Sequence, residues 1–332
     1  MLKGAGALSY RQGDYAEARA FFAQALTVAR RLDDRQNIAD LLNNLGLVSQ
    51  AQGQYAEAHA LYQDSLALTR KLGDVYGTAR TLNNLGLAAI YQGEYAAARS
   101  LLAECLAIAR QVGNKSTEDN ALNNLGMLAI HEEAYIQARA LNEEQLALAR
   151  QLGNKYGIAS ALHNLGFVAS CLGDHAAAQA LYEESLAIAN EVGDKGTIAA
   201  ALQNMGSVAA HGQEYDRARR LNRQSLTIAA EIGDRYLIAR ILEEEARLSA
   251  TQGAPALAAR LGGAAESLRA EIRAPRPPVE RAAYQQEMAV ARAAVDDRVW
   301  AAEWARGRLM APEEALAELD CANAEKRRLM AD

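Results

Sequence analysis

A five-residue string returns along this chain at steps of forty residues. It reads Leu42-Asn43-Asn44-Leu45-Gly46, and its later copies begin at Leu82, Leu122, Leu162 and Leu202. Two further series keep the same step: a turn with glycine at Gly73, Gly113, Gly153, Gly193 and Gly233, and an aromatic position at Tyr15, Tyr55, Tyr95, Tyr135, His175 and Tyr215. Self-similarity at a fixed period of this length predicts a repeat architecture in which each unit packs against its neighbours.

Each unit is predicted to contain two helices, and the unit of residues 74–113 shows the pattern. Apolar residues recur at helical spacing over about 76–91 and again over about 95–112. Gly93 separates these stretches, in the position after a helix end where a left-handed backbone costs least. Gly113 and Asn114 end the second helix and cap the next one. One such pair cannot bury its apolar face alone, so the pairs must stack.

Glycine also returns inside the first helix of each full unit, as at Gly46 and Gly86. Because a glycine there costs about 1 kcal/mol relative to alanine, its return predicts that two helix backbones meet too closely for a side chain. The composition agrees with close helix contacts, since aromatic residues make up only 5% of the chain and alanine is abundant.

The order of small and aromatic residues resembles the tetratricopeptide repeat. The matching residues are Leu45, Gly46, Gly53, Tyr55, Ala58, Tyr62 and Ser65. The resemblance covers roughly residues 4–270, and the forty-residue unit is similar to the long variant of Pins/LGN-type proteins and many bacterial signalling proteins. It implies an all-α fold, a right-handed α-α superhelix of about seven helix pairs plus a C-terminal helical cap. It also implies that the first helix of each pair faces the concave surface.

The register divides the chain into a solenoid over residues 1–272 and a C-terminal segment over 273–332. The units are expected at about 1–33, 34–73, 74–113, 114–153, 154–193, 194–233 and 234–272. The last unit is a modified capping pair whose second helix begins with Pro255. A stiff connector with three prolines follows at 275–278, and then three helices near 280–295, 298–308 and 312–328. Because Gly6 aligns with Gly46, Met1 falls inside a helix, and we expect a longer protein of which this is the C-terminal piece, or an upstream part lost in gene prediction.

The end of the chain, from Leu261 on, resembles the end of bacterial regulators in which a nucleotide-binding STAND ATPase precedes tetratricopeptide repeats. Some of these regulators carry an adenylate-cyclase-like, SARP or LuxR-type output domain. The resemblance is carried by Leu261–Glu266, the three prolines, Tyr284, Trp304–Arg308 and Glu313–Ala315. Neither an ATPase nor an output domain lies within these 332 residues.

Two rows of asparagines mark the candidate partner-binding surface. By the resemblance, one row occupies the inward position that commonly touches bound peptide: Asn44, Asn84, Asn124, Asn164 and Asn204. A neighbouring row contains Asn43, Asn83 and Asn123 and continues as His163 and Gln203. An amide can pair with the backbone of an extended chain regardless of its sequence, because it offers both a donor and an acceptor. The other interpretation, that the amides bond to neighbouring helices or only solvate a groove, stays open.

A third row changes in character along the chain: Leu47, Leu87, Met127, Phe167 and Ser207. Such change could create position-specific pockets, although half-buried packing is the favoured interpretation. No pair of lysines or arginines dominates these rows, so capture of a C-terminal carboxylate is not expected. Tyr55, Tyr95 and Tyr215 are expected in the core between pairs.

Charge and cysteine usage exclude several classes of protein. The net charge of −6 and the isoelectric point near 5.6 give no basic footprint for nucleic acid. No apolar run approaches the length of a membrane span, and the stretch from Met1 to Tyr10 lacks the apolar core of a signal peptide. Three widely spaced cysteines, Cys105, Cys171 and Cys321, argue for a reducing cytoplasm and against a disulfide framework or a zinc site. The excess of arginine over lysine suggests a GC-rich bacterial genome.

No catalytic constellation emerges from the sequence. The five histidines lack metal-ligand spacing, and Gly113-Asn114-Lys115-Ser116 lacks the glycine before the lysine that a phosphate loop needs. The run Glu243–Glu245 is expected to be a solvated face, and Cys105 a packed thiol. We therefore expect no enzyme activity, no metal and no cofactor.

The sequence favours a protein–protein interaction scaffold that binds a peptide or protein partner in its concave groove. The alternative is the C-terminal sensor or autoinhibitory region of a bacterial STAND-type ATPase regulator. In that case the partner is a ligand or an upstream ATPase domain of the same polypeptide.

Overall fold

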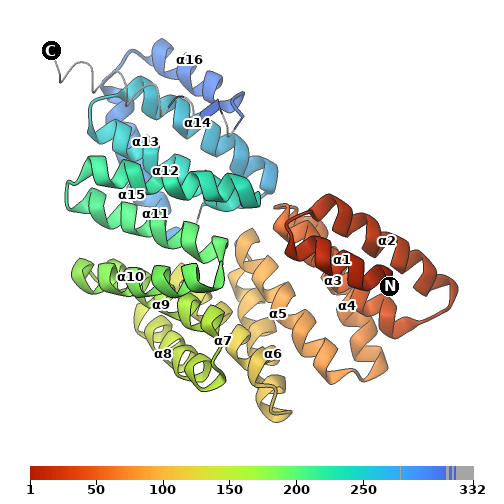
Figure 1. Ribbon diagram of the computed structural model, residues 1–332. Coiled ribbons are helices and arrows are strands. Elements are labelled where there is room, and N and C mark those ends of the chain that lie inside the picture. Colours follow the sequence, from red (N-terminus) through yellow and green to blue (C-terminus); the bar gives the residue numbers. More distant parts are fainter. Residues whose placement is uncertain (277, 312–313, 316–317, 319–332) are drawn as a thin grey trace. The chain divides into compact units, whose positions relative to one another are not determined.

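The computed structural model describes residues 1–276, 278–311, 314, 315 and 318. These residues form sixteen α-helices and no strand, which confirms the predicted all-α solenoid of stacked helix pairs (Figure 1). The helices are α1 (Leu2–Arg11), α2 (Tyr15–Arg31), α3 (Arg35–Ala51), α4 (Tyr55–Leu72), α5 (Val75–Gln92), α6 (Tyr95–Gln111), α7 (Lys115–His131), α8 (Tyr135–Leu152), α9 (Lys155–Cys171), α10 (His175–Val192), α11 (Lys195–His211), α12 (Tyr215–Ile232), α13 (Arg235–Thr251), α14 (Pro255–Ile272), α15 (Pro278–Ala293) and α16 (Asp297–Arg308).

The chain divides into two compact units. Unit 1 is Met1–Val192 with Arg273–Pro275 and contains α1 to α10. Unit 2 is Gly193–Ile272 with the described residues from Arg276 onward and contains α11 to α16. Within each unit every helix packs against the helices before and after it in the sequence. The expected division at residues 272 and 273 stays a prediction.

The regular spacing of the turns has a local cause, because in five of the pairs the turn residue before the first helix caps that helix, whereas Asn154 before α9 makes no such bond. The carboxylate of Asp74 accepts a hydrogen bond from the backbone N–H of Gly77 at 2.9 Å. The same bond recurs at Asp34, Asn114, Asp194 and Asp234. Such a cap satisfies a donor that the helix itself leaves unpaired, and it contributes about 1 kcal/mol.

The turn after a helix requires a left-handed backbone. Gly93 has the expected positive φ, 78°. Glu133 and Gln213 stand forty and one hundred and twenty residues further on, and they adopt φ values of 60° and 62°. A side chain is strained in this region of φ, so these two turns keep the geometry at a cost that glycine avoids.

The glycines inside the first helices are required for packing, although not against a backbone. A Cβ on Gly46 would lie 2.4 Å from Cε1 of Tyr62, and one on Gly86 would lie 2.6 Å from Cγ of Leu102. The predicted contact between two helix backbones is therefore wrong. In each case a side chain of the second helix fills the space that a Cβ would need.

A small polar side chain on the second helix ties it to the first helix of its own pair. Ser65 donates to the carbonyl of Ala39 at 2.8 Å, and Ser185 does the same to Ala159 at 2.7 Å. Cys105 takes this position in α6, with its Sγ 3.1 Å from the carbonyl oxygen of Ala79. Burial raises the pKa of Cys105 to about 12, so the thiol stays protonated, as expected of a packed cysteine.

Unit 2 departs from the repeat pattern in α13. Glu243, Glu244 and Glu245 were expected on a solvated face, but all three are buried. They occupy the register of Asn43, Asn44 and Leu45, whose positions are buried or half-buried in α3, α5, α7, α9 and α11. The α15 and α16 helices pack on α13 and α14, close to two of the helices expected after the prolines. The third, expected at 312–328, falls mostly outside the described residues.

Candidate partner-binding surface

The first helices of the pairs in unit 1 form a closely packed layer. The α3 helix contacts α5, α5 contacts α7, and α7 contacts α9. Consecutive second helices are instead bridged by long side chains, as by Arg70 and Glu104 at 2.7 Å and by Arg110 and Glu144 at 2.5 Å. When neighbouring helices of one layer lie closer together than those of the other layer, the stack curves, and the closely spaced layer lies on its concave side. The first helices therefore line the inner side of unit 1.

The asparagine rows meet between these first helices and form a ladder. Asn84 Nδ2 donates to Asn43 Oδ1 at 3.0 Å, and Asn124 Nδ2 donates to Asn83 Oδ1 at 2.9 Å. The next step joins Asn164 Nδ2 to Asn123 Oδ1 at 3.0 Å. Each bond thus links one helix to the first helix of the preceding pair. This is one of the two roles left open by the sequence.

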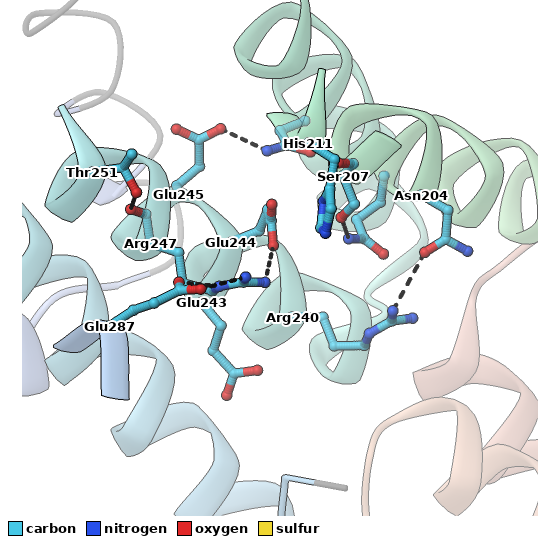
Figure 2. Close-up of polar contacts among 12 residues, drawn as sticks. Asn204, Ser207, His211, Arg240, Glu243, Glu244, Glu245, Arg247, Thr251 and Glu287 are labelled. Atoms are coloured by element: carbon cyan, nitrogen blue, oxygen red, sulfur yellow. Dashed lines mark hydrogen bonds and ion pairs between the residues drawn. The ribbon is translucent and has the colours of Figure 1, made fainter. Parts of the chain in front are cut away.

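The ladder leaves some amides more accessible than others. Asn43, Asn83, Asn124, Asn164 and Asn204 are buried, whereas Asn44, Asn84 and Asn123 are half-buried. Asn44 begins the row and makes no hydrogen bond to another described residue. In unit 2, Asn204 Oδ1 accepts from Arg240 at 3.4 Å (Figure 2). A contact of any of these amides with a partner stays a prediction.

Asp40, one helical turn before Asn43 and Asn44 on α3, forms two ion pairs. Asp40 accepts from Lys3 and from Arg80, each at 2.5 Å. Burial alone would raise the pKa of Asp40, but the hydrogen bonds from Lys3 and Arg80 outweigh it, so the pKa is lowered. The carboxylate is therefore ionised at neutral pH and holds α1 and α5 to α3.

The third row lies half-buried beside the ladder, as expected. Leu47, Met127 and Phe167 each pack against a cluster of buried residues and keep part of their surface exposed. Leu87 is half-buried as well. Together with Asn44, Asn84 and Asn123, these four apolar residues define what we call the inner face of unit 1. Of the aromatic series, Tyr55 is buried, while Tyr95 and Tyr215 are half-buried.

The acidic run of unit 2 belongs to an ionic network that sequence reasoning missed, and Figure 2 shows its part around Arg247, Glu244 and Glu287. Glu243 accepts two hydrogen bonds from Arg269 at 3.0 Å and one from Arg276 at 2.8 Å. Arg247 joins Glu244 at 3.0 Å and Glu287 of α15 at 2.8 Å. The repeat register was the available signal, since the equivalent positions of α3, α5, α7, α9 and α11 are buried or half-buried and none is exposed.

The described part of the chain has neither a cluster of metal-ligating side chains nor a membrane-spanning helix. No group of three or more His, Cys, Asp or Glu side chains among the described residues could hold a metal ion. None of the described helices is long and apolar enough to cross a membrane.

Comparison with known proteins agrees with the helix-pair architecture. The family model for the tetratricopeptide repeat matches residues 1–71, 37–111 and 117–191, together more than half of the chain. No curated protein matches the sequence.

Several solved structures are similar at low sequence identity. The Rap conjugation gene regulator of the plasmid pLS20, in complex with the Phr* peptide, is 15% identical, with a TM-score of 0.68 over 82% of this chain and 73% of that one. A Rap protein complexed with Competence and Sporulation Factor is 16% identical, with a TM-score of 0.62 over 96% and 98% of the two chains. BtubC from P. vanneervenii is 20% identical, with a TM-score of 0.51 over 64% and 90%. At these identities the likeness shows a shared fold.

Proposed function

We propose that this chain, which belongs to the tetratricopeptide repeat family, is a non-enzymatic scaffold that holds a peptide segment of a partner protein on the inner face of unit 1. The observation that carries the proposal is the composition of that face. Half-buried apolar side chains run along it beside half-buried amides on successive first helices. Such a strip matches an extended peptide, whose backbone needs hydrogen-bonding groups and whose side chains need apolar contacts.

The similar structures support a peptide rather than a small molecule as the occupant. Two of them, the pLS20 regulator with the Phr* peptide and the Rap protein with Competence and Sporulation Factor, were solved as complexes. The proposal also places the chain in the cytoplasm, as its cysteine usage indicates.

The alternative role, as the sensor or autoinhibitory end of a STAND-type ATPase regulator, stays a prediction. An in-frame nucleotide-binding domain encoded upstream of Met1 would decide in its favour.

The asparagine ladder gives a sharp test, because its members differ in their structural role. A peptide is first selected from a displayed library on the full chain, and its affinity is then measured for Asn44→Ala and Asn124→Ala. Asn44 bonds to no described residue, so its loss is expected to weaken binding about tenfold and leave the melting temperature unchanged. Asn124 is buried in the ladder, so its loss is expected to lower the melting temperature. Unchanged affinity in Asn44→Ala would remove the ligand role from this residue, and a selected peptide that binds outside unit 1 would contradict the proposal.

A further inference from the structure

Unit 2 contains a cleft of about 790 Å³ beside α14, α15 and α16. Its volume falls within the range of about 300–1,000 Å³ that small-molecule sites occupy. The residues that matter for its chemistry are Arg276, Tyr284, Met288, Trp300, Trp304 and Arg308. None of them belongs to the inner face of unit 1, so the inference below does not depend on the proposed function.

The walls of the cleft are held in place by close backbone packing. A Cβ on Gly307 of α16 would lie 1.9 Å from the carbonyl oxygen of Arg260 in α14, and one on Gly263 would lie 2.2 Å from that of Trp304. These two glycines let α14 and α16 approach as backbones, which leaves little freedom for sliding. The cleft is therefore largely preformed, as small-ligand sites usually are.

One side of the cleft is aromatic and apolar. The rings of Trp300 and Trp304 stack with centroids 5.9 Å apart, and Trp300, Met288 and Tyr284 are each buried to more than nine tenths. Trp304 is oriented by a hydrogen bond from its Nε1 to Glu266 at 2.9 Å. This surface offers the flat contact that a planar ring needs.

The lining also carries an excess of positive charge. Four arginines line the cleft, at positions 269, 276, 292 and 308, together with Glu243 and Glu266. Arg292 is paired with Asp297 at 2.9 Å, and counting that carboxylate leaves an excess of one positive charge. Glu243 is occupied on both oxygens by Arg269 and Arg276. An entering ligand therefore meets arginine N–H groups and no unoccupied carboxylate at this end.

Two buried donors at the cleft lack a hydrogen-bond partner among the described residues: Arg276 Nε and Tyr284 Oη. The guanidinium of Arg276 lies over the ring of Tyr284, 3.5 Å from its centroid. Burial raises the pKa of Tyr284 to about 12, so its hydroxyl remains a donor at neutral pH. Unpaired buried donors are costly, and an arginine can only donate. A ligand group that pairs with these donors is thus an acceptor, most strongly an anionic oxygen.

We propose that this cleft binds a small aromatic anion, with its acidic group at Arg276 and Tyr284 and its planar ring against Trp300 and Trp304. The acidic group is a carboxylate or a phosphate monoester, which share the required acceptor oxygens. The ligand class follows from three features of one cleft: its size, its aromatic wall and its paired vacant donors.

The sequence supplies a direct reporter, because its two tryptophans are Trp300 and Trp304. Tryptophan emission of the full chain is titrated with benzoate, with the neutral isostere benzamide and with phenyl phosphate. We expect a saturable change with benzoate and an affinity at least about tenfold lower for benzamide, because a hydrogen bond to a charged group is much stronger than one to a neutral group. Tighter binding of phenyl phosphate than of benzoate supports the site and assigns a phosphate to it.

The decisive variant is Tyr284→Phe, which removes a hydroxyl that forms no well-aligned hydrogen bond with a described residue, and its melting temperature is measured with its affinity to show that the fold is intact. We expect it to reduce the affinity for the anion about tenfold, while Tyr215→Phe, a matched change in the same unit at a residue that does not line the cleft, does not. Equal affinity of the wild-type chain for benzoate and benzamide would overturn the proposal. So would the absence of saturation with both anions, or an unchanged affinity in Tyr284→Phe.

Discussion

Replacement of Glu245 by glutamine tests the ionic network of α13 in a way that depends on pH. The carboxyl of Glu245 is buried, accepts one hydrogen bond from Asn222 at 2.8 Å and lies 3.9 Å from Arg219. Burial raises its pKa from the ordinary value of 4.5 to about 7, and Asn222 and Arg219 offset this only in part.

The sign and size of the effect follow from the two protonation equilibria. Below pH 4.5 the group is protonated in both the folded and the unfolded chain, so it adds no penalty. Between pH 4.5 and about 7 the folded chain binds the extra proton, so the free energy of unfolding falls as pH rises. Each pH unit contributes about 1.4 kcal/mol, and the interval therefore amounts to about 3 kcal/mol. Above pH 7 the loss is constant.

We expect the difference in unfolding free energy between Glu245→Gln and the wild type to shift by about 3 kcal/mol in favour of glutamine between pH 4.5 and 8. Urea denaturation at several pH values measures it, and hydrogen exchange of α12 and α13 reports on unit 2 alone. Glu57→Gln is the control, and its effect on the free energy of unfolding is expected to depend on pH with the opposite sign, because the hydrogen bond from Arg19 lowers the pKa of Glu57. That side chain stabilises above its unfolded pKa and loses its contribution as pH falls. A pH-independent difference for Glu245→Gln would refute the reasoning.

Two further predictions concern the glycine positions. Glu133→Gly and Gln213→Gly remove a side chain from a backbone with positive φ, so each is expected to stabilise the chain by about 1 kcal/mol in thermal unfolding; a loss of stability would show that the side chain contributes more than the strain costs. Gly86→Ala forces a Cβ to within 2.6 Å of Leu102 and is expected to destabilise by about 1–3 kcal/mol. Gly4→Ala, where a Cβ meets nothing within 4 Å, is the matched control and is expected to stabilise by up to about 1 kcal/mol. Equal effects of these two alanines would contradict the packing argument.

Much of the fold could be predicted from the sequence, because one register fixes helices, caps and interior positions together. The first helix expected over about 76–91 is found as Val75–Gln92, and the asparagine rows lie on the first helices as expected. The partners of those amides could not be predicted, because the bond from Asn84 to Asn43 depends on how two helices are rotated against each other. For the same reason the sequence indicated a close approach at Gly86 but not that Leu102 causes it.

In unit 2 the burial of Glu243–Glu245 and the cleft were not predicted, for a different reason. The run Glu243–Glu245 was interpreted by its charge, whereas its register keeps it from the exposed surface, and Glu243 meets Arg269 of the next helix, α14, and Arg276 of the segment after it. The cleft lies beside α14, the last helix of the repeat, and beside α15 and α16, in which the forty-residue pattern has ended. No periodicity connects Tyr284 with Trp304, so their meeting could only come from the structure.

The central claim, that the inner face of unit 1 holds a peptide, is tested most directly by site-specific photo-crosslinking. A crosslinking side chain is placed at Met127 on α7, within the inner face, or at Ile136 on α8, an exposed apolar residue of the second-helix layer. A peptide selected on the full chain is predicted to crosslink from position 127 and not from position 136. Crosslinking from position 136 alone would contradict the account.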